Sequence, residues 1–402
     1  MNNSLKPIII PTPAQQIITR LKSYNYEAVI VGGCVRDSLL NKTPHDYDIA
    51  TSATPQQVLS IFKDHTVIPT GIQHGTVTII ISKTPYEVTT YRIDGNYTDG
   101  RRPEQVTFTP TLYEDLRRRD FTVNALAYSK ETALIDYFNG TDDLKNKIIR
   151  CVGNPTERFS EDYLRMLRAY RFAAVLGFSI DTSVLDAIKI LKTKITAISA
   201  ERIRMELDKL LLTNNFSIIT QFLEEFSPII LPEIIINTTI LQNTAPHIPQ
   251  RLASLFHYAH NAPQTVITAL KRLKYDNNTI TLTHSILTSS KLPFTPNKSA
   301  MKRLLRDYGE TTAKHNITYH SASRSAENAA ICSQIVEEIL LNNEPYTINH
   351  LQINGSDLIS AGIPQGKAIG KALNFLLEQV IENPNLNTKE QLINLLAVNK
   401  LW

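Results

Sequence analysis

Two aspartates, Asp46 and Asp48, lie one residue apart in the stretch HDYDIAT, which otherwise has the composition of a β-strand. Side chains alternate between the two faces of a strand, so this spacing on a strand projects both carboxylates from one face. Hard divalent cations prefer oxygen ligands, and adjacent carboxylates supply them. Such a pair taken alone also fits a solvated turn or the manganese site of a sugar-nucleotide transferase, so it does not define one chemistry.

A phosphate-binding turn is indicated upstream, in VIVGGCVRDSLL, where a β-branched run ends at Gly32 and Gly33 and a helical pattern carrying Arg36 begins. Paired glycines between a strand and a helix let backbone N–H groups approach a phosphate, and a helix N-terminus favours an anion. A tight turn that needs positive φ is the alternative explanation of the glycines alone. Together, the glycines, Arg36 and the two aspartates favour a site for a triphosphate and its metal ions.

These motifs resemble a known family. GGCVRDSLLNKTPHDYDIAT is similar to the signature of the nucleotidyltransferase head in class II tRNA CCA-adding enzymes and bacterial poly(A) polymerases. Further family motifs follow in the same order: RRDFTVNALAYS resembles the block that closes the head, and RFSEDYLRMLRAYRFAAVLGF and ISAERIRMELDKLL resemble the neck. INGSDLISAGIPQGKAIGKALNFLLEQVIENPNLN resembles the tail of bacterial members. The strong motifs cover residues 28–212, and residues 215–345 carry none that we can name.

The resemblance implies an α/β head with a mixed sheet and helices at residues 1–150, followed by an all-α neck (151–215), body (216–300) and tail (301–402). It also implies that Asp46 and Asp48 hold two Mg²⁺ ions, one acting on an RNA 3′-hydroxyl and one on the departing pyrophosphate. Glu87 is a candidate third carboxylate, or an exposed strand residue. The positions that match nucleotide-contacting residues are Gly33, Arg36, Arg119, Asp162, Arg165, Arg168 and Arg171, with Arg118 as the alternative to Arg119.

The neck motif EDYLR predicts how a base is selected. Asp162 and Arg165 are three residues apart, so on a helix they lie on one face and present an acceptor beside a donor. Cytosine and adenine show an amino donor next to a ring-nitrogen acceptor, whereas uracil and guanine show the reverse. The pair therefore favours CTP and ATP, although a surface ion pair has the same spacing. Steps of three rotate around a helix of 3.6 residues per turn, so we expect Arg171 to reach phosphate or RNA.

The elements that position these residues can be predicted in outline. YEAVIVGG and TVTIIIS have the composition of strands and PQQVLSIF has helical spacing, so the region 26–128 is predicted to be α/β. Beyond Gly153 nearly everything has helical spacing, including SAERIRMELDKLLLT, an amphipathic helix with Ser199 as its expected N-cap. Turn-forming residues near positions 245 and 295 predict joints.

The composition limits the class of protein. The chain has 402 residues, of which 42% are hydrophobic, enough for two to four domains. A net charge of +4, with arginines gathered in the first half, favours a polyanionic partner there. No long apolar run predicts a membrane span, and three separated cysteines fit a reducing compartment, so we expect a cytoplasmic protein. The ten histidines form no H-D pair, so the phosphohydrolase domain of some relatives is not expected.

The leading hypothesis is a tRNA nucleotidyltransferase that adds CMP and AMP from CTP and ATP to the tRNA 3′ end, with Mg²⁺ and without a nucleic-acid template. The family alternatives are an enzyme that adds only the terminal A and a poly(A) polymerase. A CC-adding enzyme is disfavoured, because the segment YRIDGNYTDGRRPEQVTF looks complete. From another class, the alternative is a catalytically silent RNA-binding protein. The loop Asp94–Val106 is expected to help the pocket change from cytosine to adenine. The sequence determines neither the order of addition nor the oligomeric state.

Overall fold

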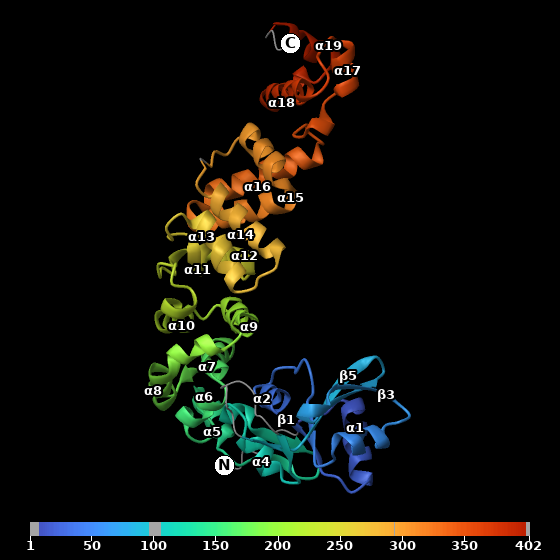
Figure 1. Cartoon of the computed structure of the whole chain (residues 1–402), viewed down its shortest axis with the longest axis vertical. Coiled ribbons are helices and arrows are strands. Elements are labelled where there is room, and N and C mark those ends of the chain that lie inside the picture. The colour runs from blue at the N-terminus through green and yellow to red at the C-terminus, as the bar shows by residue number, and fades with distance from the viewer. Residues whose placement is uncertain (1–7, 96–105, 293, 399–402) are drawn as a thin grey trace. The chain divides into compact units, whose positions relative to one another are not determined.

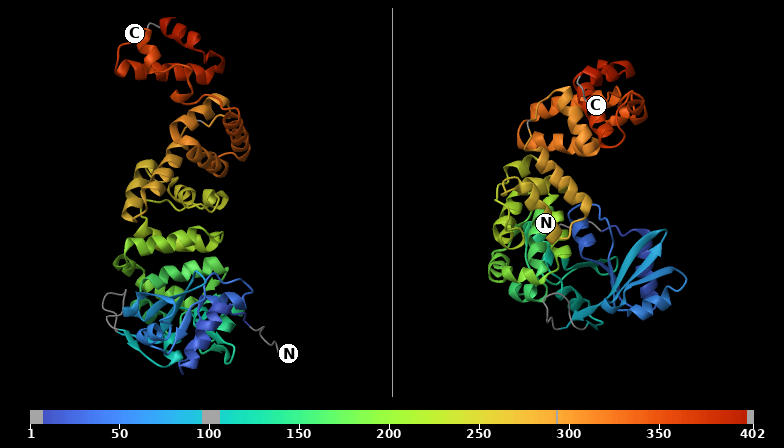
Figure 2. Two further views of the ribbon diagram at one scale, coloured as in Figure 1. Left: turned by 90° about the vertical axis from the view of Figure 1, so that its right-hand side faces the viewer. Right: turned by 45° about the horizontal axis from the view of Figure 1, so that its top comes forward.

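The chain forms two compact units, residues 1–232 and 233–402. The computed structural model describes residues 8–95, 106–292 and 294–398. Strands occur in the first unit, and the described part of the second unit contains helices alone (Figures 1 and 2). The predicted fold class, an α/β region followed by a helical one, is confirmed. The division into four parts at residues 150, 215 and 300 stays a prediction.

A seven-stranded mixed sheet forms the centre of the first unit. The strands, in spatial order, are β3 (Thr66–Gly71), β4 (Thr76–Ile81), β5 (Thr84–Thr90), β2 (Ile49–Thr51), β1 (Ala28–Val31), β8 (Leu126–Ser129) and β9 (Ala133–Asp136). β2 runs parallel to β5 and antiparallel to β1, with Ile30 opposite Ile49. The residue that ends β1 therefore lies beside the residue that precedes β2, which brings the two sequence motifs together.

Five helices accompany this sheet: α1 (Thr12–Ser23), α2 (Gly33–Leu39), α3 (Pro55–Ile61), α4 (Leu112–Arg117) and α5 (Gly140–Asn146) (Figure 1). The predicted helix at PQQVLSIF is α3, which begins with a capping box between Thr54 and Gln57. Leu112 and Leu116 of α4 pack against Val29 and Val31, which share one face of β1. Two short strand pairs, β6 (Arg92–Asp94) with β7 (Val106–Phe108) and β10 (Ile148–Ile149) with β11 (Ser179–Ile180), complete this part.

The helices that follow the sheet are α6 (Pro155–Glu161), α7 (Leu164–Leu176), α8 (Thr182–Leu191), α9 (Ala200–Leu211) and α10 (Phe216–Ile230). α7 packs against α9 and α10, and the Tyr170 ring meets Phe222 and Phe226 edge-on at centroid distances of 5.7 and 5.9 Å. α9 begins after Ser199 as predicted, but the Ser199 side chain makes no capping hydrogen bond. The apolar contacts of α7 and α9 fix their polar sides, which carry residues of the site.

The second unit contains α11 (Thr239–Asn243), α12 (Ile248–Phe256), α13 (Ala262–Arg272), α14 (Asn277–Ser289), α15 (Lys298–Ser323), α16 (Ala326–Leu341), α17 (Gly355–Ser360), α18 (Lys367–Glu382) and α19 (Lys389–Val398). The helical run of α15 is interrupted at Gly309, whose φ of 73° is left-handed. The predicted joints near 245 and 295 lie between α11 and α12 and between α14 and α15. Within the described ranges, no helix combines the length and apolarity that crossing a bilayer requires.

Candidate nucleotide-binding cleft

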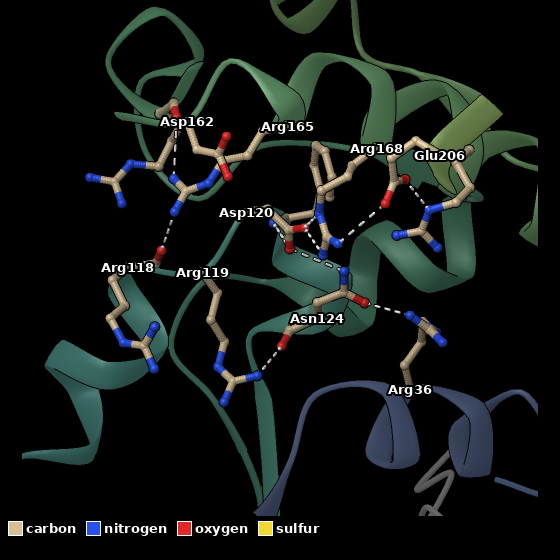
Figure 3. Close-up of polar contacts among 12 residues, drawn as sticks. Arg36, Arg118, Arg119, Asp120, Asn124, Asp162, Arg165, Arg168 and Glu206 are labelled. Atoms are coloured by element: carbon tan, nitrogen blue, oxygen red, sulfur yellow. Dashed lines mark hydrogen bonds and ion pairs between the residues drawn. The ribbon is translucent and has the colours of Figure 1, made fainter. Parts of the chain in front are cut away.

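A cleft of about 490 Å³ in the first unit collects most of the residues that the sequence singled out. It is lined by six arginines and four aspartates together with small and apolar residues: Arg36, Arg118, Arg119, Arg165, Arg168, Arg202, Asp46, Asp48, Asp120, Asp162, Gly32, Gly33, Asn124, Leu164 and Phe172. The side chains come from the sheet region and from α7 and α9 (Figure 3). An excess of guanidinium over carboxylate groups suits a polyphosphate ligand.

The Gly32–Gly33 turn connects β1 to α2 at one wall of the cleft. Gly32 has a φ of 75°, which explains the glycine at this position, and a Cβ there would lie 2.7 Å from Arg119 Nη1. Gly33 begins α2, and Arg36 lies on the first turn of that helix with its Nη2 near Gly33. Because α2 has only seven residues, we attribute the positive charge of this wall to Arg36 rather than to the helix dipole.

Asp46 and Asp48 do not lie on a strand, contrary to the prediction. β2 begins at Ile49, and the two aspartates form the extended segment before it, where the Asp48 carbonyl accepts from the Val31 N–H at 3.0 Å. The ladder thus continues for one bond beyond the strand, so the proposed alternation is kept locally. Asp46 is exposed and Asp48 is half-buried. Burial raises the pKa of Asp48 to about 6, with the charges of Asp46 and Glu87 adding to the rise and Arg119 opposing it.

The two aspartates fit a divalent cation by the chemistry of their donor set. Among the described residues no cationic side chain forms an ion pair with either one, and the negative charges of Asp46 and Glu87 add repulsion to the rise that burial causes in the pKa of Asp48. A divalent cation would relieve that repulsion. Glu87 lies on β5 as predicted; the parallel register, with Ile49 opposite Val88, brings it near Asp48, but it does not line the cleft. In the described ranges no group of three or more His, Cys, Asp or Glu side chains forms a ready-made metal cluster.

Arg118 and Arg119 both line the cleft. The structure therefore does not decide which of them matches the nucleotide-contacting position of the family. Asp115 holds both: it accepts from Arg118 Nη2 at 2.7 Å and from Arg119 Nη2 at 3.3 Å. Arg119 is completed by a bond of 3.4 Å to the carbonyl oxygen of Asn124. These two bonds of Arg119 are long, and a phosphate oxygen would compete with them well.

Asp120 is the organising carboxylate of the cleft, and the sequence did not identify it as a site residue. It is buried; one oxygen accepts from Arg168 Nε and Nη2 at 2.8 and 2.5 Å, the other from Asn124 Nδ2 at 3.1 Å (Figure 3). Asn124 in turn accepts from Arg36 at 2.5 Å. Burial alone would raise the pKa of Asp120, but Arg168, Asn124 and Arg165 outweigh it and hold the pKa at about 2. Two cleft arginines are therefore oriented by one ionised group.

Asp162 and Arg165 do not share a helix face, because Asp162 lies in the break between α6 and α7. Its backbone is extended and its Oδ1 accepts from the N–H of Leu164, the first residue of α7, at 3.0 Å. Its Oδ2 accepts from Arg202 at 2.7 Å. Arg165 lies on α7 and is buried. Both residues still line the cleft, so the predicted proximity holds while its helical basis was wrong.

Arg168 and Arg171 are separated as predicted, because Arg168 lines the cleft and Arg171 does not. Arg171 is paired instead with the buried Glu206 of α9. Phe172 packs beneath these groups, with the guanidinium carbons of Arg171, Arg168 and Arg36 at 3.8, 5.2 and 5.4 Å from its ring centroid. Cation–π attraction lets three like charges gather around one ring. The expectation that Arg171 reaches phosphate or RNA stays a prediction.

Family comparisons agree along the chain. The family described as "Poly A polymerase head domain" matches residues 28–150. A family described as an RNA- and SrmB-binding site of polymerase A matches residues 177–235, and one described as tRNA nucleotidyltransferase domain 2 matches residues 248–396. Together they cover the sheet region, the helices after α7 and most of the second unit.

Individual relatives carry one name. The CCA-adding enzyme of Oceanobacillus iheyensis is 55% identical over 197 residues, a match that spans 49% of each chain. The CCA-adding enzyme of Limosilactobacillus fermentum is 36% identical over 397 residues, 95% of each chain. Among solved structures, the Bacillus stearothermophilus CCA-adding enzyme in complex with CTP is 30% identical, with a TM-score of 0.80 over 97% of this chain and 98% of that one. The Thermotoga maritima CCA-adding enzyme complexed with tRNA, 21% identical with a TM-score of 0.69, shares the fold. The chain belongs to the family of CCA-adding enzymes, the tRNA nucleotidyltransferases with a poly(A) polymerase-type head.

Proposed function

We propose that this chain adds CMP and AMP units from CTP and ATP to the 3′ end of tRNA, without a nucleic-acid template. The observation that carries the proposal is that one cleft holds two carboxylates, Asp46 and Asp48, which have no cationic partner among the described residues, together with an arginine-rich wall and the carboxylate of Asp162. These are the groups that a nucleoside triphosphate needs for its metal ions, its phosphates and its base edge. A catalytically silent RNA-binding protein would not need two adjacent carboxylates in this cleft.

The triphosphate is bound by arginines that the protein orients in advance. Arg36 and Arg168 are held through Asp120 and Asn124, so their guanidinium groups are fixed before the ligand arrives. Arg119 is held more loosely, and it is the residue we expect to move onto a phosphate oxygen. Preorganised cations gain more in the transition state than mobile ones, because no reorganisation accompanies the reaction.

Asp46 and Asp48 would hold divalent cations, proposed to be Mg²⁺, with Glu87 as the candidate third carboxylate. When bound, such cations lower the pKa of the attacking 3′-hydroxyl and neutralise charge on the leaving pyrophosphate. The chain itself contributes the fixed position of Asp48, whose backbone carbonyl is part of the sheet ladder.

Base selection is assigned to the end of the cleft at Asp162. Its ionised carboxylate can only accept hydrogen bonds. It can therefore bind the exocyclic amino group of cytosine or adenine, and it repels the carbonyl oxygen of uracil or guanine. Each matched pair of this kind discriminates by about 1–3 kcal/mol. Replacing Asp162 by Ala should therefore relax selection against UTP and GTP.

The extent of addition is tested with three tRNA transcripts, ending before CCA, after C and after CC, each incubated with CTP and ATP separately and together. Completion of all three to the same CCA end supports the proposal. Addition to the CC-ended transcript alone would identify an A-adding enzyme, and long A tracts a poly(A) polymerase. Incorporation of neither nucleotide would leave the RNA-binding alternative. The predicted switching loop lies mostly in residues 96–105, outside the described residues, and stays a prediction, as does a cytoplasmic location.

A further inference from the structure

Phe172, in the second half of α7, is an aromatic residue among the charged groups of the cleft. The guanidinium groups of Arg36 and Arg168 lie over its ring, with their central carbons 5.4 and 5.2 Å from the ring centroid. Arg36 belongs to α2 and Arg168 to α7, so one ring contacts cleft cations from two separate helices. Contacts within about 6 Å are attractive, because the face of an aromatic ring carries partial negative charge.

Hydrogen bonds hold each of these guanidinium groups along its edge. Arg36 donates from Nε to Asp37 and from Nη1 to Asn124, at 2.8 and 2.5 Å. Arg168 donates from Nε and Nη2 to a single oxygen of Asp120, at 2.8 and 2.5 Å (Figure 3). Such bonds lie in the guanidinium plane, so they fix its edge better than its tilt. A ring packed against the planar face supplies the constraint on tilt.

The ring of Phe172 is itself held by two further contacts. The fully buried Phe121 meets it at a centroid distance of 5.8 Å, with the two ring planes 76° apart. The guanidinium carbon of Arg171, which does not line the cleft, lies 3.8 Å from the centroid, and Arg171 is paired with the buried Glu206. These contacts restrict rotation of the ring, so it can serve as a fixed surface for the two cleft arginines.

We propose that Phe172 is a positioning residue for the triphosphate of the incoming nucleotide: its ring fixes the guanidinium groups of Arg36 and Arg168 in the orientation that binds phosphate. The inference rests on the proposed function, in which these two arginines bind the triphosphate, and it assigns a role there to an uncharged side chain. A guanidinium group has five N–H donors, and the contacts of both arginines within the described residues use only part of them. Both therefore keep donors for phosphate oxygens.

A ring that only fills space predicts a different response to a change in its charge distribution. Fluorine atoms withdraw electrons from the face of the ring, which weakens or reverses its attraction for cations, while the shape of the side chain changes little. A space-filling role tolerates this change, whereas the proposed role does not. Fluorinated variants of Phe172 therefore separate the electrostatic contribution of the ring from its packing.

The test replaces Phe172 by pentafluorophenylalanine in the full-length protein. The dissociation constant for inorganic tripolyphosphate, measured by titration calorimetry, should rise about threefold to thirtyfold, as the loss of one or two cation–π contacts predicts. The kcat/KM for CTP on a transcript lacking CCA, and for ATP on a CC-ended transcript, should fall by a similar factor. The preference for CTP over UTP should stay at the wild-type value, because the triphosphate is common to both.

The matched control places pentafluorophenylalanine at Phe222 of α10. Phe222 is also buried and meets Tyr170 edge-on at 5.7 Å, but among the described residues no guanidinium group lies over its ring. Fluorination there changes a packed aromatic contact away from the cleft. Affinity for tripolyphosphate should therefore stay at the wild-type value, even if the thermal melting temperature falls.

Trifluorophenylalanine at Phe172 covers the case in which the pentafluorinated variant does not fold, judged by thermal melting. It withdraws less charge from the ring face, so the dissociation constant should rise by a smaller factor, about twofold or more. Wild-type affinity for tripolyphosphate in a folded variant at Phe172 would overturn the proposal, as would an equal loss at Phe222 or a wild-type protein that binds no tripolyphosphate. If the wild-type protein binds tripolyphosphate but incorporates no nucleotide on any transcript, the proposed function fails, and the binding measurement still tests the role of Phe172.

Discussion

The two units differ in the kind of polar group that they bury, which is mainly charged in the first unit and mainly neutral in the second. In the first unit, buried carboxylates face guanidinium groups: Asp120 binds Arg168, Glu206 binds Arg171, and Asp115 binds Arg118 and Arg119. In the second unit, most buried polar groups are neutral. The buried His320 ring stacks on Phe294 at 3.8 Å, the half-buried rings of His247 and His315 stack on each other at 4.3 Å, and the fully buried Asn316 has no hydrogen-bond partner among the described residues.

The difference follows from what each interior has to do. Ion pairs between buried groups give little net stability, but they fix charges in space, which a site for a polyphosphate requires. In the described part of the second unit the buried cationic side chains are Arg251 and Lys302, of which Lys302 pairs with Glu344 at 2.9 Å, and apolar packing of helices forms much of the remaining interior. Burial lowers the pKa of His247, His257, His315 and His320, so this interior is built for neutral histidines.

The largest effect on nucleotide incorporation is expected at Asp46 and Asp48, which, unlike the buried carboxylates above, have no cationic partner among the described residues. Asp46→Ala or Asp48→Ala should lower the incorporation of CMP and AMP about a thousandfold or more, because several kcal/mol of transition-state stabilisation would depend on the cations that we propose they hold. Folding should be unaffected, since the substitution removes repulsion and not a partner. Steady-state incorporation and a thermal melt measure the two. Asp186→Ala, at an exposed pair on α8, is the control, and near-normal turnover in either site variant would contradict the metal assignment.

Breaking a charge pair of the first unit should cost stability as well as activity. Asp120→Asn leaves Arg168 without its anion and should lower the free energy of unfolding by about 2–3 kcal/mol. Asp142→Asn removes an exposed pair, with side chains 64% and 71% exposed, and should cost less than about 1 kcal/mol. Urea unfolding at pH 7 compares the two. Equal losses would mean that burial does not distinguish these pairs.

Lowering the pH should reduce the stability contributed by a buried group of each unit over a different pH range. His320 has a folded-state pKa lowered to about 4 by burial and by the charge of Arg324, against about 6.5 when unfolded. Protons then bind the unfolded chain first, so stability is lost as pH falls from about 6.5 to 4, by roughly 2 kcal/mol for this residue. The pKa of Asp120, about 2, keeps its contribution intact down to about pH 4, and it is lost only below that.

The measurement is urea unfolding followed by circular dichroism at pH 7.0, 5.5 and 4.5. His320→Leu should be less sensitive to pH over this range than the wild-type protein, whereas Asp120→Asn should show the wild-type dependence. Identical dependence in the wild-type and His320→Leu proteins would show that the buried histidine stays neutral without cost, and it would remove the contrast between the units.

The smallest expected effect concerns the backbone of the second unit. Gly309→Ala places a Cβ at a φ of 73°, where no neighbouring atom obstructs it, so only the left-handed conformation opposes the change. We expect a loss of about 1 kcal/mol in thermal unfolding. Gly370→Ala, inside α18 and equally unobstructed, should instead be neutral or stabilising by up to about 1 kcal/mol. The same sign for both changes would mean that the interruption of α15 carries no strain for an L-residue.

Much of the cleft could be predicted because its chemistry is local in sequence. The glycine turn, the aspartate pair and the arginine motifs each occupy a few consecutive residues. Each of them resembles a motif of the family, and they follow one another along the chain in the family's order. The placement of Asp46 and Asp48 on a strand was wrong: they lie three residues and one residue before β2, which is short and is preceded by a single ladder bond to the Asp48 carbonyl.

The misses share a different cause, which is long-range pairing. RFSEDYLRML contains no Gly or Pro, so nothing local predicts the helix break at Asp162, which depends on its bond to the Leu164 N–H and on Arg202. Asp120 attracts notice only once its partner Arg168 is known, 48 positions later. In the helical second unit the histidines carry no spacing that foretells stacking, and the absence of a nameable motif there reflects packing that many apolar sequences can supply.

The pair of Asp120 and Arg168 has a consequence for how this molecule can be recombined. The carboxylate belongs to the segment that matches the head family, residues 28–150, and its arginine lies on α7, beyond that boundary. A chimera that takes its head from one relative and its later helices from another therefore takes the two residues of this ion pair from different proteins. Such hybrids should work only when both parents supply the matching half, so the unit of exchange extends past the head at least to the end of α9.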